Sequence, residues 1–340
     1  MKEKEFDLIS FGEIMLRLSP SRNERLVRGD SFEKRAGGSE LNVASGVSLL
    51  GLRTAVLSKL PSNALGQFIR NRTRFVGVSD DYLIYDESHD ARLGVYYYEN
   101  GAAPRKPAIV YDRIGSCFSA FSLADVPEEV YGNTKIFHTS GISLGLNEHM
   151  QEVTSAMIRK FKENGAQISF DVNFRANLWD EETAHKVIEK VLPYIDILFI
   201  SEETCRRMFQ KEGDLKDIQK SFAQEYGCKI VATTRRKVNS PKSHDFGSMI
   251  YYAQTDTYYD EPDYKEIDVV DRVGSGDAYC SGVLFGLLKY NDPFKALQFG
   301  NATSAMKNTI PGDLPSSDFA EIDGIIANHN ATGPVGEMNR

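Results

Sequence analysis

Strand-like apolar runs and amphipathic stretches alternate along most of the chain. The apolar run at residues 135–144 precedes residues 147–165, where Met150, Met157 and Phe161 recur at the spacing of one helix face. The order repeats, with strands expected near residues 166–173, 196–201 and 229–234 and helices near 181–195 and 215–227. Such alternation predicts right-handed crossovers, a parallel sheet with helices on both faces, and ligands beyond the carboxyl ends of the strands.

Two segments, residues 13–35 and 91–114, interrupt this order. Both are rich in β-forming residues and contain little that favours a helix, so we expect a small sheet that projects from the main domain and can cover a site. The alternative is an edge hairpin that extends the central sheet. The predicted α/β core comprises residues 1–12, 36–90 and 115–330, and a polar tail comprises residues 331–340.

Composition and charge narrow the class of protein. The 340 residues carry a net charge of −8, which does not favour nucleic acid or an anionic membrane surface as a partner. The first residues lack the pattern of a signal peptide and no apolar run is as long as a bilayer span, so a cytoplasmic location is expected. Neither the six histidines nor the four cysteines have metal-ligand spacing, and the cysteines are expected to be reduced thiols: Cys117, Cys205, Cys228 and Cys280.

The stretch DRVGSGDAYCSGVLFGLL, residues 271–288, is the strongest candidate for chemistry. A strand is expected to end at Asp271, a turn containing Gly274 and Gly276 follows, and an apolar helix begins near Asp277. Glycines let a ligand approach the backbone, and the free N–H groups of a first helical turn form an anion site that suits a transferring phosphoryl group. Asp277 could accept the proton of an attacking hydroxyl; alternatively it only caps the helix.

Two other glycine motifs are excluded. The chain has no Gly-Lys pair and therefore no P-loop. Tyr279 occupies the place of the third glycine in the dinucleotide fingerprint, which argues against a nicotinamide-dependent dehydrogenase. A phosphate site of another design remains.

Two stretches resemble the signatures of the ribokinase-like (PfkB) sugar kinases. Residues 271–288 resemble the C-terminal signature D-T-x-G-A-G-D, and GGSELNVASGVSLLG, residues 37–51, resembles the N-terminal G-G-x-x-x-N-x-A. The likeness covers nearly the whole chain and implies a three-layer α/β/α fold with a central mainly parallel sheet and a small β-sheet lid. Within the family the chain looks most like 2-keto-3-deoxygluconate kinases, in the stretches at residues 25–44, 92–116, 170–179 and 305–313.

The resemblance implies transfer of the γ-phosphoryl group of ATP to the primary hydroxyl of 2-keto-3-deoxygluconate, which gives the 6-phosphate. Asp277 would be the base, and the amides of Gly274, Ser275 and Gly276 the anion hole. The implied substrate-binding residues are Gly37, Gly38, Asn42, Tyr96, Tyr111, Arg113, Arg175 and Asp277. An arginine fork matches a carboxylate, so the two arginines favour an acidic sugar over a neutral one; their alternative role is surface salt-bridging.

The resemblance also implies residues that would bind the nucleotide and ions. The implied nucleotide-binding residues are Asn173, Arg175, Thr233, Gly274, Gly276, Asn301 and Ala302, and the basic segment 233–247 either flanks the adenosine or is a solvated hairpin tip. Mg²⁺ would bridge the ATP phosphates mostly through water. The family commonly binds a monovalent cation such as K⁺ near the signature turn, through backbone carbonyl oxygens.

The sequence departs from the family pattern at four positions. Arg272 and Ser275 replace the usual Thr and Ala of the signature, and Ser201 and Thr204 replace the Asn and Glu of the N-x-x-E motif linked to Mg²⁺. Three alternatives therefore stay open: a kinase of fructose, tagatose 6-phosphate or another sugar, a catalytically silent sugar-binding homologue, and, more distantly, a dehydrogenase. The expected partners are a sugar acid, ATP and further copies of the chain joined through the lid.

Overall fold

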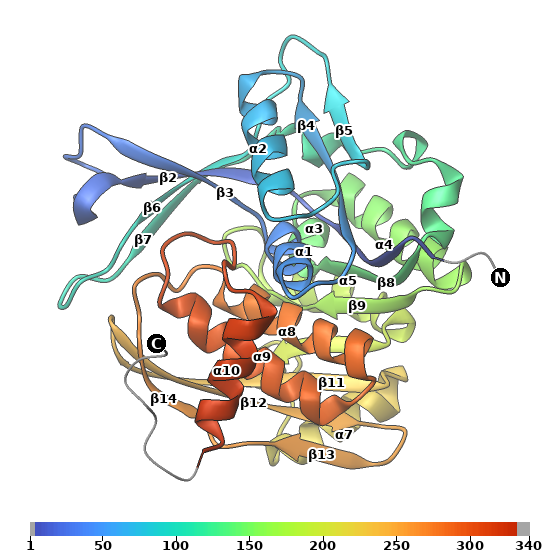
Figure 1. The fold of residues 1–340 in the computed structure, drawn as a ribbon. Helices are drawn as coiled ribbons and strands as arrows, with labels where there is room; N and C mark the ends of the chain where they lie inside the picture. The colour runs from blue at the N-terminus through green and yellow to red at the C-terminus, as the bar shows by residue number, and fades with distance from the viewer. Residues whose placement is uncertain (1–3, 332–340) are drawn as a thin grey trace.

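A large twisted sheet forms the centre of the computed structural model, which describes residues 4–331 (Figure 1). Its ten strands run in the order β13-β12-β11-β10-β9-β8-β1-β4-β5, with β14 paired to β12. Pairing is parallel from β11 to β5, and β12, β13 and β14 are antiparallel additions. The strands are β1 Phe6–Phe11, β4 Thr54–Pro61, β5 Leu83–Asp86, β8 Thr134–Ser140, β9 Gln167–Asp171, β10 Ile197–Ser201, β11 Ile230–Ser240, β12 Ser243–Tyr252, β13 Thr257–Asp260 and β14 Tyr264–Asp268.

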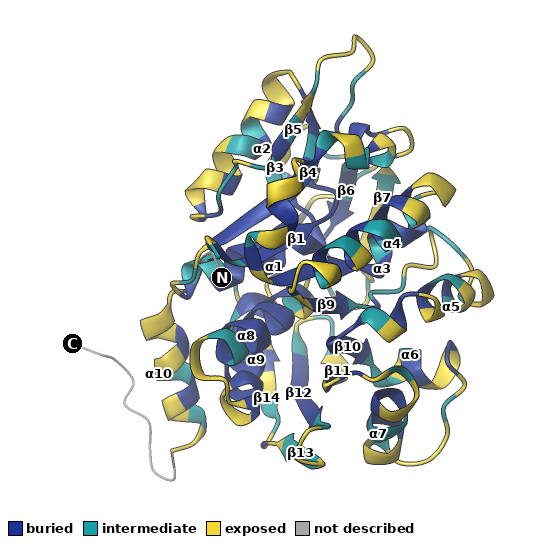
Figure 2. Ribbon diagram, turned by 90° about the vertical axis from the view of Figure 1, so that its right-hand side faces the viewer, coloured by how far each residue is buried: buried dark blue, intermediate teal, exposed yellow. Residues whose placement is uncertain are grey.

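Helices cover both faces of this sheet, as Figure 2 shows. Along β10, Leu198 and Ile200 pack into the hydrophobic cluster under α4, α5 and α7, whereas Ile197 and Phe199 pack under α1, α8 and α9. Alternate side chains of one apolar run thus bury on opposite faces, which is why the strand sequences are apolar throughout. The helices are α1 Ser39–Leu49, α2 Ala64–Phe75, α3 Gly141–Gly145, α4 Glu148–Glu163, α5 Glu181–Glu189, α6 Glu202–Arg207, α7 Leu215–Tyr226, α8 Ser275–Tyr290, α9 Pro293–Asn308 and α10 Phe319–His329.

A separate four-stranded sheet projects from the main domain (Figure 1). Its order is β3-β2-β6-β7, and β2 pairs antiparallel with β3 and parallel with β6. The strands are β2 Met15–Pro20, β3 Phe32–Gly37, β6 Val95–Glu99 and β7 Ala108–Asp112. The predicted fold class is confirmed, and the alternative of an edge hairpin on the central sheet is wrong.

One predicted strand end differs from the structure, whereas one open alternative agrees with it. The strand expected to end at Asp271 ends at Asp268, because the backbone then leaves the sheet and the N–H groups of Val270 and Asp271 donate to the carbonyl of Asn308. The basic segment 233–247 is a hairpin in which β11 pairs with β12, and residues 236–239 and 242, toward its tip, are exposed. The alternative of a solvated hairpin tip thus agrees with the structure, although Arg235, Arg236 and Lys237 also line the cavity described below. The predicted polar tail lies outside the described residues, apart from residue 331.

Two further expectations concern thiols and membranes. The four cysteines are free and buried, in agreement with the prediction of reduced thiols. Within residues 4–331, no helix combines the length and the apolar character that crossing a membrane requires.

Candidate active site

A cavity of about 1040 Å³ opens at the carboxyl ends of β9 and β10 and beside β11, the expected place for a ligand in a parallel sheet. Asp171 and Ser201 line it from the ends of β9 and β10, and Thr234, the partner of Ser201, lines it from within β11. The turn before α8 forms another wall, and Tyr98 and Tyr111 reach it from the small sheet. The cavity therefore lies between the two sheets.

The turn that opens α8 has the backbone form of an anion site. Gly274 has a φ of 83°, and a Cβ there would lie 2.2 Å from the carbonyl oxygen of Asp313, so only glycine fits. The helical hydrogen bonds begin with Ala278 N–H to Gly274 O at 2.8 Å. Ser275, Gly276 and Asp277 line the cavity, and the N–H groups of Gly276 and Asp277 precede that bond. Of the amides predicted for the anion hole, that of Ser275 already donates to the carbonyl oxygen of Arg272 at 3.3 Å, so Gly276 and Asp277 offer the free N–H groups.

Asp277 lies where the two signature stretches meet. Its Oδ1 accepts a hydrogen bond from Ser39 Oγ at 2.7 Å, and its Oδ2 accepts one from Asn42 Nδ2 at 2.6 Å. Asn173 Nδ2 donates to the same Ser39 Oγ at 2.9 Å. The N-terminal cap of α8 is Gly274 and receives no side-chain hydrogen bond, so Asp277 is not merely a helix cap.

Burial makes Asp277 a better proton acceptor than an ordinary aspartate. Desolvation raises its pKa, while the hydrogen bonds from Asn42 and Ser39 and the charge of Arg175 oppose that rise. Asp171, in the same cavity, has its pKa raised to about 7 by desolvation and by the charge of Asp277. Such raised values suit proton transfer near neutral pH.

Sequence reasoning missed a buried ion network behind the turn. Arg17 is 1% exposed, and its guanidinium lies 2.5 Å from Asp271 Oδ2 and 2.7 Å from Asp313 Oδ1. Its Cζ also lies 4.4 Å from the ring centre of Tyr98. Tyr96 donates its hydroxyl to Asp313, so this predicted substrate residue is already engaged within the protein. Asp313 ends the family-like stretch 305–313, the one signal that could have identified it.

The two predicted glycines of the N-terminal signature are packed against backbone and side chains. Gly38 has a φ of 145°, and a Cβ there would lie 2.5 Å from the carbonyl oxygen of Glu13. A Cβ on Gly37 would lie 2.5 Å from Asp313 Oδ2. Gly37 therefore packs against Asp313 and Gly38 against Glu13, and neither of them lines the cavity.

The two predicted carboxylate-binding arginines have different surroundings. Arg113 is 7% exposed, is not among the residues lining the cavity, and binds Glu13 through Nε at 2.8 Å, so its charge is already matched. Arg175 lines the cavity, is exposed, and forms no ion pair with any residue among 4–331. Of the two predicted arginines, only Arg175 is therefore positioned for an anionic ligand. The predicted Tyr111 also lines the cavity.

Three predicted nucleotide residues do not line the cavity. Thr233 is fully buried, and because side chains alternate along β11 its neighbour Thr234 faces the cavity instead. Asn301 is bound within the core to Ser248 Oγ and Glu261 Oε1, both at 2.7 Å. Ala302 packs with the aromatic residues of α8 and α9.

The cavity contains unpaired positive charge. Four of its basic residues form no ion pair within residues 4–331: Arg175, Arg236, Lys237 and Arg272. The pKa of the nearby His244 is lowered by burial and by the charges of Arg236 and Arg272. An arrangement of unpaired cations beside free helix amides fits a polyphosphate.

The SEET segment provides no carboxylate free for a metal. Ser201 caps α6 by accepting from Thr204 N at 3.1 Å, and Glu202 and Glu203 pair with arginines one turn later. No group of three potential ligands occurs in the described part of the chain. A Mg²⁺ ion bound here would therefore need phosphate or water oxygens among its ligands.

Comparison with known proteins finds a family of enzymes that matches nearly the whole chain. Residues 5–318 match the family described as pfkB family carbohydrate kinase. The chain is 33% identical to the 2-dehydro-3-deoxygalactonokinase of Haloferax volcanii, over 96% of this chain and 98% of that protein. It is 28% identical to the 2-dehydro-3-deoxygluconokinase of Bacillus subtilis, over 91% of this chain and 92% of that protein. The crystal structure of the 2-dehydro-3-deoxygluconokinase of Thermotoga maritima superposes with a TM-score of 0.89 at 33% identity, covering 94% of this chain and 99% of that one.

Proposed function

The chain belongs to the pfkB family of carbohydrate kinases, and we propose that its substrate is 2-keto-3-deoxygluconate, also called 2-dehydro-3-deoxygluconate. The observation that carries this proposal is Asp277, held by Ser39 and Asn42 at the mouth of an anion-binding turn, with the unpaired Arg175 in the same cavity. A buried carboxylate beside free amides suits phosphoryl transfer to a hydroxyl. An unpaired guanidinium suits a substrate with a carboxylate.

In the proposed reaction Asp277 accepts the proton of the primary hydroxyl of the sugar acid. The hydroxyl oxygen bonds to the γ-phosphorus of ATP, the bond to the bridging oxygen breaks, and ADP leaves with that electron pair. The amides of Gly276 and Asp277 stabilise the charge on the transferring group. Arg236 and Arg272 bind the nucleotide phosphates, and Mg²⁺ when bound neutralises phosphate charge.

Arg175 and Tyr111 are proposed to hold the sugar acid on the opposite side of the turn from the nucleotide. The C4 epimer, 2-keto-3-deoxygalactonate, is a second candidate because the relatives include kinases named for either acid. The two epimers present the same carboxylate and primary hydroxyl, so the features described above favour neither.

The test is an ADP-release assay with MgATP and a panel of acceptors: both keto-deoxy acids, fructose, ribose, tagatose 6-phosphate and a blank without sugar. Turnover confined to the keto-deoxy acids is expected. Turnover of neutral sugars at the same rate would refute the role of Arg175. ADP release in the blank without sugar alone, or no ADP release with any acceptor, would refute the sugar-kinase proposal for this chain.

Two further expectations accompany the function. We expect copies of the chain to associate through the small sheet. Its outer strands, β3 and β7, each have one edge without a neighbouring strand, and they expose Phe32, Ile109 and Val110. Light scattering after gel filtration tests this, and a monomer at micromolar concentration would contradict it.

The cytoplasm is the location that we expect for a reaction that consumes ATP.

A further inference from the structure

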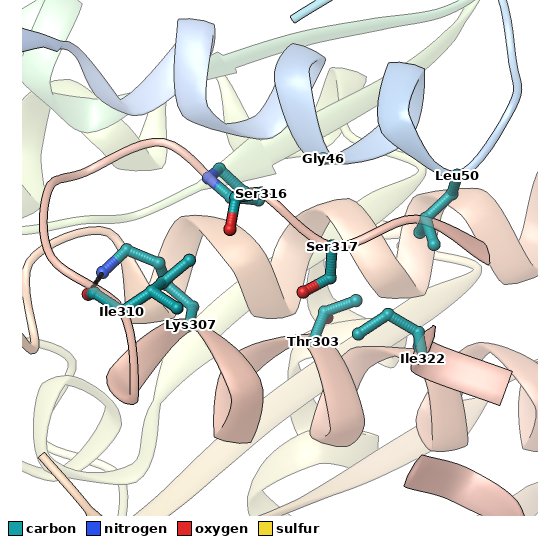
Figure 3. A pocket seen from close by; sticks show the side chains of 9 residues that line it. Gly46, Leu50, Thr303, Lys307, Ile310, Ser316, Ser317 and Ile322 are labelled. Carbon is teal, nitrogen blue, oxygen red and sulfur yellow. Dashed lines mark hydrogen bonds between the residues drawn. The ribbon is translucent and has the colours of Figure 1, made fainter. Parts of the chain in front are cut away.

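A buried lysine lies behind the phosphate-binding turn. Lys307, near the end of α9, is 1% exposed. Its Nζ donates to the carbonyl oxygens of Asp271 at 3.1 Å and of Ile310 at 3.4 Å, and Figure 3 shows the side chain reaching Ile310. Within residues 4–331 it forms no ion pair at contact distance with a carboxylate, so backbone carbonyls are its hydrogen-bond partners.

The surrounding charges favour retention of the ammonium. Burial lowers the pKa of Lys307 to about 8, while the nearby carboxylates of Asp271 and Asp313 raise it. Together with Arg17, the cluster has two cations and two carboxylates and is neutral as a whole. Loss of the ammonium would leave one carboxylate charge unmatched in a buried place, which is costly.

The two carbonyls belong to the segments that shape the turn. The carboxylate of Asp271 accepts hydrogen bonds from the N–H groups of Val273 and Gly312, each at 3.0 Å. The carbonyl of Asp313 lies against Gly274. The Lys307 ammonium therefore joins residues 271–274 to residues 310–313, and both segments border the amides assigned to phosphate binding.

We propose that Lys307 is a positioning residue, a built-in monovalent cation that fixes the turn before α8 by binding backbone carbonyls, so that the protein needs no K⁺ or NH₄⁺ there. Carbonyl oxygens facing one buried charge are also the ligands that a free monovalent ion would use. The proposal replaces the expected K⁺ with a side chain of this chain. The test by activity rests on the proposed kinase function, whereas the test by thermal unfolding does not depend on it.

The first test needs no variant. Activity of the unaltered protein with MgATP and the sugar acid is compared in KCl, NH₄Cl and choline chloride at equal ionic strength. Equal rates are expected, because the cation is already present. Strong activation by K⁺ or NH₄⁺ over choline would overturn the proposal.

The second test removes the ammonium. Lys307→Ala leaves room for an ion, and its kcat in choline chloride should fall by about 10²-fold, as expected when reacting groups are slightly misplaced. K⁺ or NH₄⁺ should restore part of that loss and should raise the thermal unfolding temperature of the variant more than choline does. Lys295→Ala, an exposed lysine on the same helix, is the matched control and should show neither effect.

The outcomes separate the two claims. Absence of sugar-acid kinase activity in the unaltered protein would refute the proposed function, and the unfolding temperatures would still decide the role of Lys307. A Lys307→Ala protein whose activity and unfolding temperature are the same in K⁺ and choline would refute the built-in cation. If that variant does not fold, the ion comparison on the unaltered protein decides.

Discussion

Glu40 is expected to destabilise the protein increasingly as the pH rises. It lies in the first turn of α1, is 1% exposed, and accepts a hydrogen bond from Ser140 Oγ at 2.6 Å. Burial, with a smaller contribution from the charge of Asp277, raises its pKa from 4.5 to about 7. The proton is therefore bound more tightly in the folded protein, and the stabilisation that it brings is present below pH 4.5 and lost as the pH rises through 7.

Glu40→Gln keeps the shape of the side chain and removes the titration. Because the pKa rises from 4.5 to about 7, ionisation of Glu40 lowers the free energy of unfolding by about 3 kcal/mol above pH 8, compared with low pH. At pH 5 the loss is about 1 kcal/mol. The variant should therefore gain about 2 kcal/mol of unfolding free energy relative to the unaltered protein between these pH values. Any packing cost of the amide is the same at both pH values and cancels.

The assay is urea denaturation of both proteins at pH 5 and pH 8.5, with the exposed Glu163→Gln as control. The expected result is a pH-dependent stability difference for Glu40→Gln and none for the control. The same difference at both pH values would refute the account of Glu40, because it would mean that the carboxyl titrates alike in the folded and unfolded protein.

Three further predictions concern the turn and the ions behind it. Arg17→Met should lower the unfolding free energy by about 3–5 kcal/mol, because it leaves two buried carboxylates without their cation. Arg53→Met, which removes an exposed ion pair, should cost less than about 1 kcal/mol. Equal losses of stability in urea denaturation would contradict this prediction. Gly274→Ala should cost about 1–3 kcal/mol because its φ is 83° and its Cβ meets a carbonyl oxygen, whereas Gly276→Ala, with open space around it, should unfold at an unchanged temperature. Burial raises the pKa of Asp277, so kcat/KM should fall on acidification at a higher pH than for an ordinary aspartate, and a pH profile that stays flat to the usual aspartate range would exclude it as the base.

The regular part of the fold follows from local sequence patterns. The alternation of apolar runs with amphipathic stretches predicted the parallel sheet and its helices, and the β-rich segments 13–35 and 91–114 predicted the separate small sheet. Strand ends were less predictable: β14 stops at Asp268 because α9, distant in sequence, offers Asn308 as a backbone partner.

Side-chain partners were the less predictable part of the site. Arg113 resembles a ligand residue in sequence, but Glu13, 100 residues away, matches its charge. Thr233 and Thr234 differ by one position on a strand, and that single step decides which of them faces the cavity. Arg17 and Asp313 meet across 296 residues, so no local pattern could reveal their pair.

Asp277 is proposed to accept the proton of the primary hydroxyl of a keto-deoxy sugar acid during phosphoryl transfer. The most direct test measures formation of the 6-phosphate by ³¹P NMR with the unaltered protein, with Asp277→Asn and with the exposed control Asp90→Asn. Product is expected from the unaltered protein and from the control. For Asp277→Asn, kcat should be lower by about 10²–10⁴-fold, with the unfolding temperature preserved. Product formed at the same rate by a folded Asp277→Asn protein would contradict this role of Asp277.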